Sequence, residues 1–209
     1  MKQTSPVVEV RSVIFDLFGV VISFDEGSVY RRLAVHCGEP ATAFAALQGL
    51  VSTPELVTGR LSLRQLHRQL VVAHGLALDY GAFHESWLTP YTAAMPGIAS
   101  LLGELGSRCR LVLLSNVDRY YLDVVRGLHR ELDNFDVQLF SCELGVAKPG
   151  SAAFTAALRA AKARPQECYF IDDKRENVHA AGRLGVAGHV FRNTQALRAA
   201  LIEKRILAG

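Results

Sequence analysis

Four groups of polar residues in this chain contain the functional groups that phosphoryl transfer needs. They are Asp16, Ser115-Asn116, Gly145-Val-Ala-Lys148-Pro149 and Asp172-Asp173. A carboxylate can act as a nucleophile, hydroxyl and amide groups can donate to phosphate oxygens, and a lysine can balance the developing charge. A pair of carboxylates also offers the oxygen ligands that a hard cation such as Mg²⁺ prefers. These groups therefore predict a metal-assisted phosphoryl-transfer site.

The acidic residues need a cation if they share one site, because three neighbouring carboxylates repel one another and raise each other's pKa. Mg²⁺ and Lys148 together would remove that difficulty. Asp172 directly follows an apolar run, so we expect it to be the closer metal ligand, with Asp173 ligating through water or orienting its loop. Gly19 has no side chain to keep an anion away from backbone N–H groups, so we expect it to contribute to substrate binding.

Each of these groups also has a purely structural explanation. Asp16 could satisfy the amides of a turn, and Lys148 could be a solvated loop lysine. Ser115-Asn116 and Asp172-Asp173 could instead cap the helices that follow them. Each explanation is more common than a functional role when it is taken singly. The occurrence of all four groups in one chain, each following a strand-like run, favours a single site.

The elements that would position these groups alternate between strands and helices. Apolar runs predict strands over residues 13–15, 110–114, 137–141, 168–171 and 186–191. Helical spacing predicts helices over 98–105, 121–128, 151–163, 176–184 and 194–207. Such alternation specifies right-handed crossovers and an α/β fold, a Rossmann-like parallel sheet flanked by helices. Ligands bind at the carboxyl ends of the strands in such sheets, where the four groups would meet.

The segment between the first strand and residue 95 has a different character. Its apolar residues recur every three or four positions, which indicates amphipathic helices, with Ser62 and Asp79 as helix N-caps. We predict a helical cap domain over residues 23–94, inserted into a core of residues 1–22 and 95–209. Substrate would bind between the two, where the cap residues Arg60, Trp87 and Tyr91 are candidates to face it.

Composition narrows the possible partners and location. The chain has 209 residues and a formal charge of +3, which is too small and too dispersed to predict nucleic-acid binding. No apolar run is long enough to span a bilayer, residues 1–11 lack the apolar stretch of a signal peptide, and we expect no membrane association. The four cysteines show no metal-binding spacing and are expected to be reduced. We expect a cytoplasmic protein, a monomer or a homodimer.

The four groups occur in the order seen in the haloacid dehalogenase superfamily, and the chain resembles a subfamily I hydrolase with a helical C1 cap. Its motifs resemble those of the subgroup that contains the glucose-1-phosphatase-like enzymes and the epoxide hydrolase N-terminal phosphatase. The resemblance implies an Mg²⁺-dependent phosphatase of small phosphorylated metabolites. Asp16 would be the nucleophile that forms an aspartyl-phosphate, with Lys148 bridging it to phosphate. The remaining implied contacts are phosphate binding by Ser115 and Asn116, and Mg²⁺ ligation by Asp16, the Phe18 carbonyl, and Asp172 or Asp173.

One residue departs from the phosphatase pattern. Phosphatases of this superfamily usually have a second aspartate two residues after the nucleophile, which protonates the leaving group; this chain has Phe18 there. The Phe18 carbonyl can still ligate a metal, but its ring cannot transfer a proton. Asp25, a cap residue such as His84, or water are the candidates for a replacement acid.

The departure leaves two alternative functions open. Haloacid dehalogenases have a tyrosine at the Phe18 position but use no metal, and the Asp172-Asp173 pair argues against that reaction. A degenerate, non-catalytic binding or regulatory protein would keep the fold without needing Asp16 and Lys148. A dinucleotide-binding domain is disfavoured because no GxGxxG follows the first strand.

Overall fold

The computed structural model describes residues 9–51, 53–89 and 92–208. Its centre is a five-stranded, fully parallel sheet in the order β5-β4-β1-β6-β7. In chain order the strands of this sheet are β1 (Ser12–Phe15), β4 (Arg110–Ser115), β5 (Val137–Phe140), β6 (Cys168–Asp172) and β7 (Ala187–Val190). The predicted α/β fold with a parallel sheet is therefore confirmed.

The first strand lies in the middle of the sheet. Phe15 is aligned with Leu113 of β4 on one side and with Ile171 of β6 on the other. Because all three strands run in the same direction, the residues that follow them emerge at one edge. Asp16, Ser115 and Asp172 therefore reach the same edge although up to 156 positions separate them.

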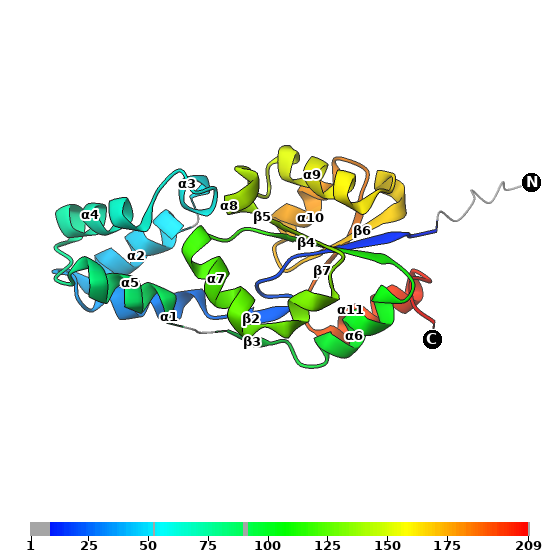
Figure 1. Ribbon diagram of the computed structural model, residues 1–209, viewed down its shortest axis with the longest axis horizontal. Helices are drawn as coiled ribbons and strands as arrows, with labels where there is room; N and C mark the ends of the chain where they lie inside the picture. The colour runs from blue at the N-terminus through cyan, green and yellow to red at the C-terminus, as the bar shows by residue number, and fades with distance from the viewer. Residues whose placement is uncertain (1–8, 52, 90–91, 209) are drawn as a thin grey trace, which may run out of the picture.

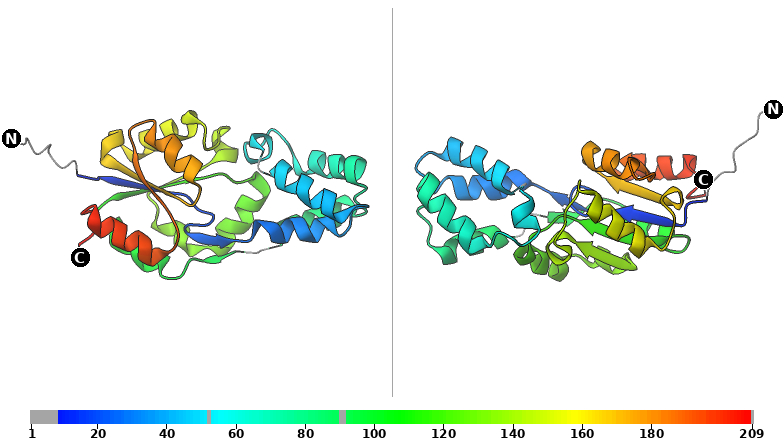
Figure 2. Two further views of the ribbon diagram at one scale, coloured as in Figure 1. Left: turned by 180° about the vertical axis from the view of Figure 1, so that it is seen from behind. Right: turned by 90° about the horizontal axis from the view of Figure 1, so that it is seen from above.

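Helices cover both faces of the sheet (Figures 1 and 2). Ile14 and Val112 pack against α9 and α10 on one face, whereas Val13 and Phe15 pack in the core cluster that includes α6, α7 and α11 on the other. Burial on both faces explains why β1 is a continuous apolar run. The helices of the core are α6 (Ile98–Gly106), α7 (Arg119–Leu128), α8 (Ser141–Leu144), α9 (Ser151–Ala161), α10 (Arg175–Gly182) and α11 (Thr194–Glu203).

The segment between β1 and α6 extends from the strand carboxyl ends as a helical layer (Figure 1). It leaves through β2 (Ile22–Phe24) and returns through β3 (Thr92–Ala94), which pair antiparallel. Its helices are α1 (Glu26–Ala34), α2 (Pro40–Val51), α3 (Pro54–Val57), α4 (Leu63–His74) and α5 (Tyr80–Leu88). These helices share a hydrophobic cluster of their own, which is consistent with a separate cap, although the boundaries at 22/23 and 94/95 remain predictions.

Both predicted N-caps in the helical segment are confirmed. The Ser62 hydroxyl and the Gln65 side chain form a reciprocal capping box at the start of α4. The Asp79 carboxylate accepts a hydrogen bond from the Ala82 backbone N–H at the start of α5. A cap accepts hydrogen bonds from backbone N–H groups that are unpaired only in the first turn of a helix. It therefore depends on residues close together in the chain, which is why the local sequence was sufficient to predict both caps.

Several element ends differ from the predicted ranges. Ser141 opens α8 and does not extend β5, because its hydroxyl accepts from the Val117 N–H and donates to the Val57 carbonyl. The helix predicted to reach residue 163 ends at Ala161, where Lys162 takes a left-handed conformation with φ 53°. The last helix ends at Glu203 and not at residue 207. Local apolar patterns do not contain these tertiary contacts and chain reversals.

Two further expectations concern cysteines and membranes. Cys37, Cys109, Cys142 and Cys168 are all free and buried, as predicted for reduced thiols. Within the described ranges, no helix combines the length and apolar character needed to cross a bilayer.

Candidate active site

Lys148 is at the centre of the site and is not a solvated loop lysine. Its side chain is 1% exposed, and its Nζ lies 2.7 Å from Asp16 Oδ1 and 2.7 Å from Asp172 Oδ2. Burial by itself would lower the pKa of Lys148, but the two carboxylates outweigh burial and raise it. Lys148 is therefore a permanent positive charge held between the ends of β1 and β6.

The side chain of Asn116 holds Lys148 in place. Asn116 Nδ2 donates to the Lys148 carbonyl at 2.8 Å, and Asn116 Oδ1 accepts from the Lys148 N–H at 2.9 Å. The peptide bond that follows, Lys148–Pro149, is cis. Asn116 is not a helix cap, because Asp118 is the N-cap of α7. The Asn116 side chain thus connects the end of β4 to the Lys148 loop, a role that the sequence did not reveal.

The two residues of the acid pair have different surroundings. Asp172 is fully buried and accepts from Lys148 Nζ, from the Lys174 N–H at 2.8 Å and from Asn177 Nδ2 at 2.9 and 3.0 Å. Asp173 lines a cavity, and its buried Oδ1 has no hydrogen-bond partner within the described part of the chain. Neither residue caps α10, because the N-cap position of that helix is Lys174. Asp172 is saturated by protein donors, whereas Asp173 retains ligand capacity.

Unpartnered buried polar atoms at this edge fit a bound cation and anion. Oxygens of Asp16, Asp172 and Asp173 lie within 4.8 Å of one another, so a divalent ion could contact more than one of them. Ser115 is 1% exposed, and its hydroxyl has no partner among residues 9–51, 53–89 and 92–208. Buried polar groups are rarely left without partners in native proteins. The donor set therefore fits both Mg²⁺ and a phosphate group.

The protonation of Asp16 reflects the same need for a cation. Burial raises the pKa of Asp16 to about 7; Lys148 opposes the shift, whereas Asp172 and Asp173 add to it. Burial and the neighbouring Asp172 also raise the pKa of Asp173. A divalent cation at this position would favour the ionised carboxylates and so prepare Asp16 to act as a nucleophile.

Gly19 lines the cavity and lies against Asp173. Its N–H donates to the Ile22 carbonyl at 2.8 Å, so it is not a free donor for an anion. Its φ is +79°, and a Cβ placed there would lie 2.7 Å from Asp173 Oδ2. Its missing side chain leaves room for the Asp173 carboxylate. The contribution of Gly19 to substrate binding stays a prediction.

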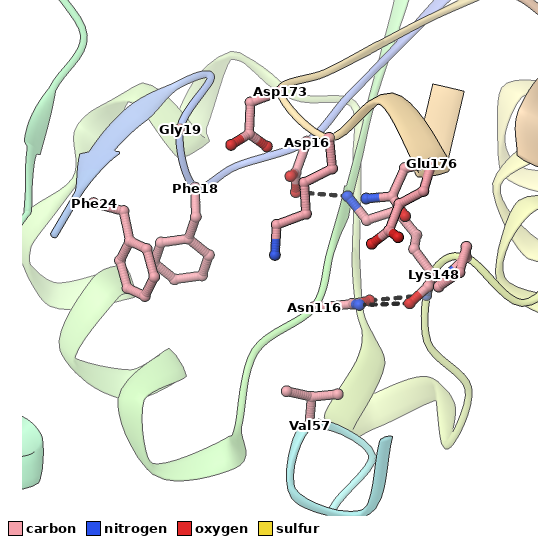
Figure 3. A pocket seen from close by; sticks show the side chains of 12 residues that line it. Asp16, Phe18, Gly19, Phe24, Val57, Asn116, Lys148, Asp173 and Glu176 are labelled. Carbon is pink, nitrogen blue, oxygen red and sulfur yellow. Dashed lines mark hydrogen bonds and ion pairs between the residues drawn. The ribbon is translucent and has the colours of Figure 1, made fainter. Parts of the chain in front are cut away.

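The cavity in front of these residues has a volume of about 330 Å³ and two unlike sides (Figure 3). One side carries the charged and amide groups, and the other carries the rings of Phe18 and Phe24. Val57 of the cap segment lies below Asn116 in this view. The cavity is lined by Asp16, Phe18, Gly19, Phe24, Val57, Asn116, Lys148, Pro149, Asp173, Lys174, Glu176 and Asn177. Phe24, Val57 and Glu176 were not identified from the sequence, because no local pattern marks them.

Other candidates lie elsewhere. Arg60 is exposed and pairs with Glu55 at 3.7 Å, and Trp87 is buried with its Nε1 donating to Asp118 Oδ2 at 3.2 Å. Asp25 pairs with Arg31 at 2.9 Å, and the His84 ring packs against that of Tyr120. None of these four candidate residues lines the cavity, and Tyr91 lies outside the described residues.

Comparisons with known proteins place the chain among hydrolases. A family model described as haloacid dehalogenase-like hydrolase matches residues 10–185. The D-ribitol-5-phosphate phosphatase of Bacteroides thetaiotaomicron is 23% identical over 184 residues, which is 84% of this chain and 89% of that protein. The sesquiterpene phosphatase astK of Aspergillus oryzae is 33% identical over 92 residues, which is 44% of this chain and 47% of that protein.

A solved structure shares the fold over most of its length. The HAD family enzyme BT-2542 of Bacteroides thetaiotaomicron, in complex with magnesium and inorganic phosphate, superimposes with a TM-score of 0.71 at 19% identity. The superposition covers 88% of this chain and 96% of that one. At this identity the similarity is one of fold.

Proposed function

Since the chain belongs to the haloacid dehalogenase-like hydrolases, we propose that it is an Mg²⁺-dependent phosphatase of small phosphomonoesters that works through an aspartyl-phosphate. The main support is the arrangement around Lys148, whose Nζ contacts both Asp16 and Asp172 beside the unpartnered Oδ1 of Asp173. Two relatives with phosphatase names, one for a polyol phosphate and one for a sesquiterpene, support the reaction class.

Asp16 would be the nucleophile. Its Oδ1 already accepts from Lys148 Nζ and from the Leu17 N–H at 2.7 Å, which holds the carboxylate in one orientation. A carboxylate oxygen of Asp16 would form a bond to phosphorus while the phosphorus–oxygen bond to the organic group breaks, and the departing oxygen takes up a proton. A water would then attack phosphorus, releasing phosphate and restoring Asp16.

The remaining residues would bind the phosphoryl group and the cation. The Ser115 hydroxyl and the Asn116 N–H would donate to phosphate oxygens, and Lys148 would neutralise the charge that develops on them. Asp16, the Phe18 carbonyl and Asp173 would hold Mg²⁺, with Asp172 fixing Lys148 beside them. When bound, Mg²⁺ would supply positive charge that lets an anionic phosphate approach the carboxylates.

The two alternative functions have weaker support. A dehalogenase without a metal would have to hold three carboxylates, Asp16, Asp172 and Asp173, close together without a divalent cation. Lys148 contacts only Asp16 and Asp172 among them within the described residues. A non-catalytic protein would have no need for a buried carboxylate whose pKa is raised to about 7, mainly by burial. Both alternatives can be tested directly by the products they release.

We expect phosphate release from members of a panel of phosphorylated metabolites when Mg²⁺ is present, and loss of that release when a chelator is in excess. Phosphate and halide should be measured in parallel, with 2-chloropropionate as the halogenated substrate. Phosphate release that continues in excess chelator would contradict the proposed metal dependence. Halide release without phosphate release would identify a dehalogenase, and neither product would favour a binding protein.

The acid pair provides a second prediction. Since Asp172 is saturated by protein donors and Asp173 is not, we propose Asp173 as the direct metal ligand, the reverse of the expectation from sequence. Residues behind a ligand typically contribute 10- to 100-fold to metal affinity. Asp173→Ala should therefore weaken Mg²⁺ binding by more than about 100-fold, and Asp172→Ala by about tenfold.

Isothermal titration calorimetry with Mg²⁺ would measure both variants. The titrations belong at pH 8, above the pKa of about 7 for Asp16, so that protons do not compete for its carboxylate. Asp133→Ala removes an exposed acid outside the cavity and is the matched control. A larger loss of affinity in Asp172→Ala than in Asp173→Ala would restore the original assignment.

A further inference from the structure

The rings on the aromatic side of the cavity have no part in the proposed phosphoryl transfer. Phe18 and Phe24 are half-buried, and their ring centroids lie 4.7 Å apart. Tyr121, which is buried at the start of α7, contacts Phe18, with ring centroids 6.3 Å apart. Because Phe18 packs against both Phe24 and Tyr121, its ring is supported. We call the two phenylalanine rings the aromatic wall.

The aromatic wall faces the same space as the phosphoryl-binding groups. Both phenylalanines line the cavity that also contains Asp16, Lys148 and Asp173 (Figure 3). In an in-line displacement the leaving group departs on the side of phosphorus away from Asp16, into the cavity that Phe18 and Phe24 line. The wall is therefore placed to contact the organic part of the substrate.

The cap segment adds another apolar group to the cavity. Val57 lines the cavity, and its carbonyl accepts from the Ser141 hydroxyl at 2.6 Å, which connects α3 to the core. Arg60, three residues later, is exposed and directed to Glu55 and Thr58. Among the described lining residues, α1 to α5 therefore contribute an apolar group and no charge.

These observations bear on the substrate class, because the aromatic wall and Val57 offer no side-chain hydrogen bonds. A polyol placed against them would lose hydrogen bonds to water without replacement, which is unfavourable, whereas an apolar or aromatic group would be stabilised by burial and ring contact. We infer that the substrates are phosphomonoesters with an apolar, preferably aromatic or unsaturated, organic group that packs on Phe18 and Phe24. This inference rests on the proposed phosphatase function.

Binding of two phosphonates in the presence of Mg²⁺ would test the aromatic wall without requiring turnover. Benzylphosphonate and methylphosphonate share the phosphoryl end and differ in the group that would reach the wall. We expect the wild type to bind benzylphosphonate about tenfold more tightly than methylphosphonate, which is near the upper end of what an aromatic contact contributes. Equal affinity of the two phosphonates for the wild type would overturn the inference.

Variants of Phe24 test whether this residue causes the preference for benzylphosphonate over methylphosphonate. Phe24→Ala should reduce the benzyl-to-methyl affinity ratio to about threefold or less while methylphosphonate affinity stays within about twofold, because ring contact is lost and the phosphoryl end is unchanged. Phe24→Leu keeps apolar volume in β2 and should give an intermediate ratio. Val72→Ala, an 88% exposed site on α4, is the control that should leave the ratio unchanged. An unchanged ratio in both Phe24 variants would exclude the aromatic wall.

Turnover separates failure of this inference from failure of the proposed function. Benzyl phosphate and glycerol 3-phosphate both release alcohols, so leaving-group acidity differs little between them. A higher kcat/KM for glycerol 3-phosphate would overturn the inference and leave the phosphatase proposal intact. Tight benzylphosphonate binding with no phosphate release from any ester would support the aromatic wall and refute the phosphatase.

Discussion

Asp16→Asn is expected to lower phosphatase turnover by at least about 10³-fold, which corresponds to about 4 kcal/mol of transition-state stabilisation. The substitution keeps the shape of the side chain but removes the charge that would attack phosphorus and ligate Mg²⁺. It also removes the ion pair in which Lys148 Nζ lies 2.7 Å from Asp16 Oδ1. Losses of this size are typical when the nucleophile of a covalent mechanism is removed.

Single-turnover phosphate release at saturating Mg²⁺ is the measurement that reports this effect. Asp133→Asn, an exposed position outside the cavity, is the matched control and should retain full turnover. Circular dichroism of both variants should show that the fold is retained. An Asp16→Asn enzyme within tenfold of wild type would refute the nucleophilic role of Asp16.

A steep dependence on leaving-group pKa is the second large effect that we expect, and it follows from Phe18. A positioned general acid contributes about 10²- to 10⁴-fold in rate. Phe18 cannot supply a proton, and neither Asp25 nor His84 lines the cavity. Phosphate esters of poor leaving groups such as alcohols should therefore react slowly, whereas aryl phosphates and acyl phosphates, which need little protonation, should react faster.

Introducing an acid at position 18 should flatten the dependence of the rate on leaving-group pKa. Phe18→Asp is expected to raise the single-turnover rate of alkyl phosphates by at least about tenfold, below the full range because the smaller side chain leaves space beside Phe24 and Tyr121. Phe18→Asn has the same shape without a transferable proton and is the matched control. The two variants should therefore differ in the rate of alkyl esters and agree for aryl esters.

Rates for a series of aryl and alkyl phosphates would provide the test. A nearly flat series in the wild type would show that another group protonates the leaving oxygen. Glu176, which lines the cavity from α10, would then be the first residue to replace. Equal rates for Phe18→Asp and Phe18→Asn with alkyl esters would show that position 18 cannot serve a general acid in this chain.

The sequence by itself was sufficient to predict the fold class and to identify the charged residues at the centre of the candidate site. Asp16, Ser115 and Asp172 each lie at or just after the end of an apolar run, and parallel strands bring such ends to one edge. The helix starts at Ser62 and Asp79 were also predictable, because a cap depends only on residues within one turn. These features depend on local patterns.

Contacts between distant segments determine the surroundings of the site residues, and only the tertiary structure shows these contacts. Asn116 holds the Lys148 backbone from 32 residues away, and Gly19 leaves room for Asp173 across the site. The different environments of Asp172 and Asp173 arise from Lys148 and Asn177, although the two acids are adjacent in sequence. No local pattern records which of two neighbouring carboxylates is saturated by donors.

The aromatic wall illustrates the same limit. The family resemblance predicts an acid at the position of Phe18, but the sequence does not show that Phe24 and Val57 share its cavity. Phe24 is brought there by the antiparallel pairing of β2 with β3, and Val57 by a hydrogen bond to Ser141, 84 residues away. Side-chain type and spacing thus predicted the chemistry that we propose for the chain. Packing between the cap segment and the core determined what surrounds that chemistry, because burial and hydrogen-bond partners are properties of the folded chain.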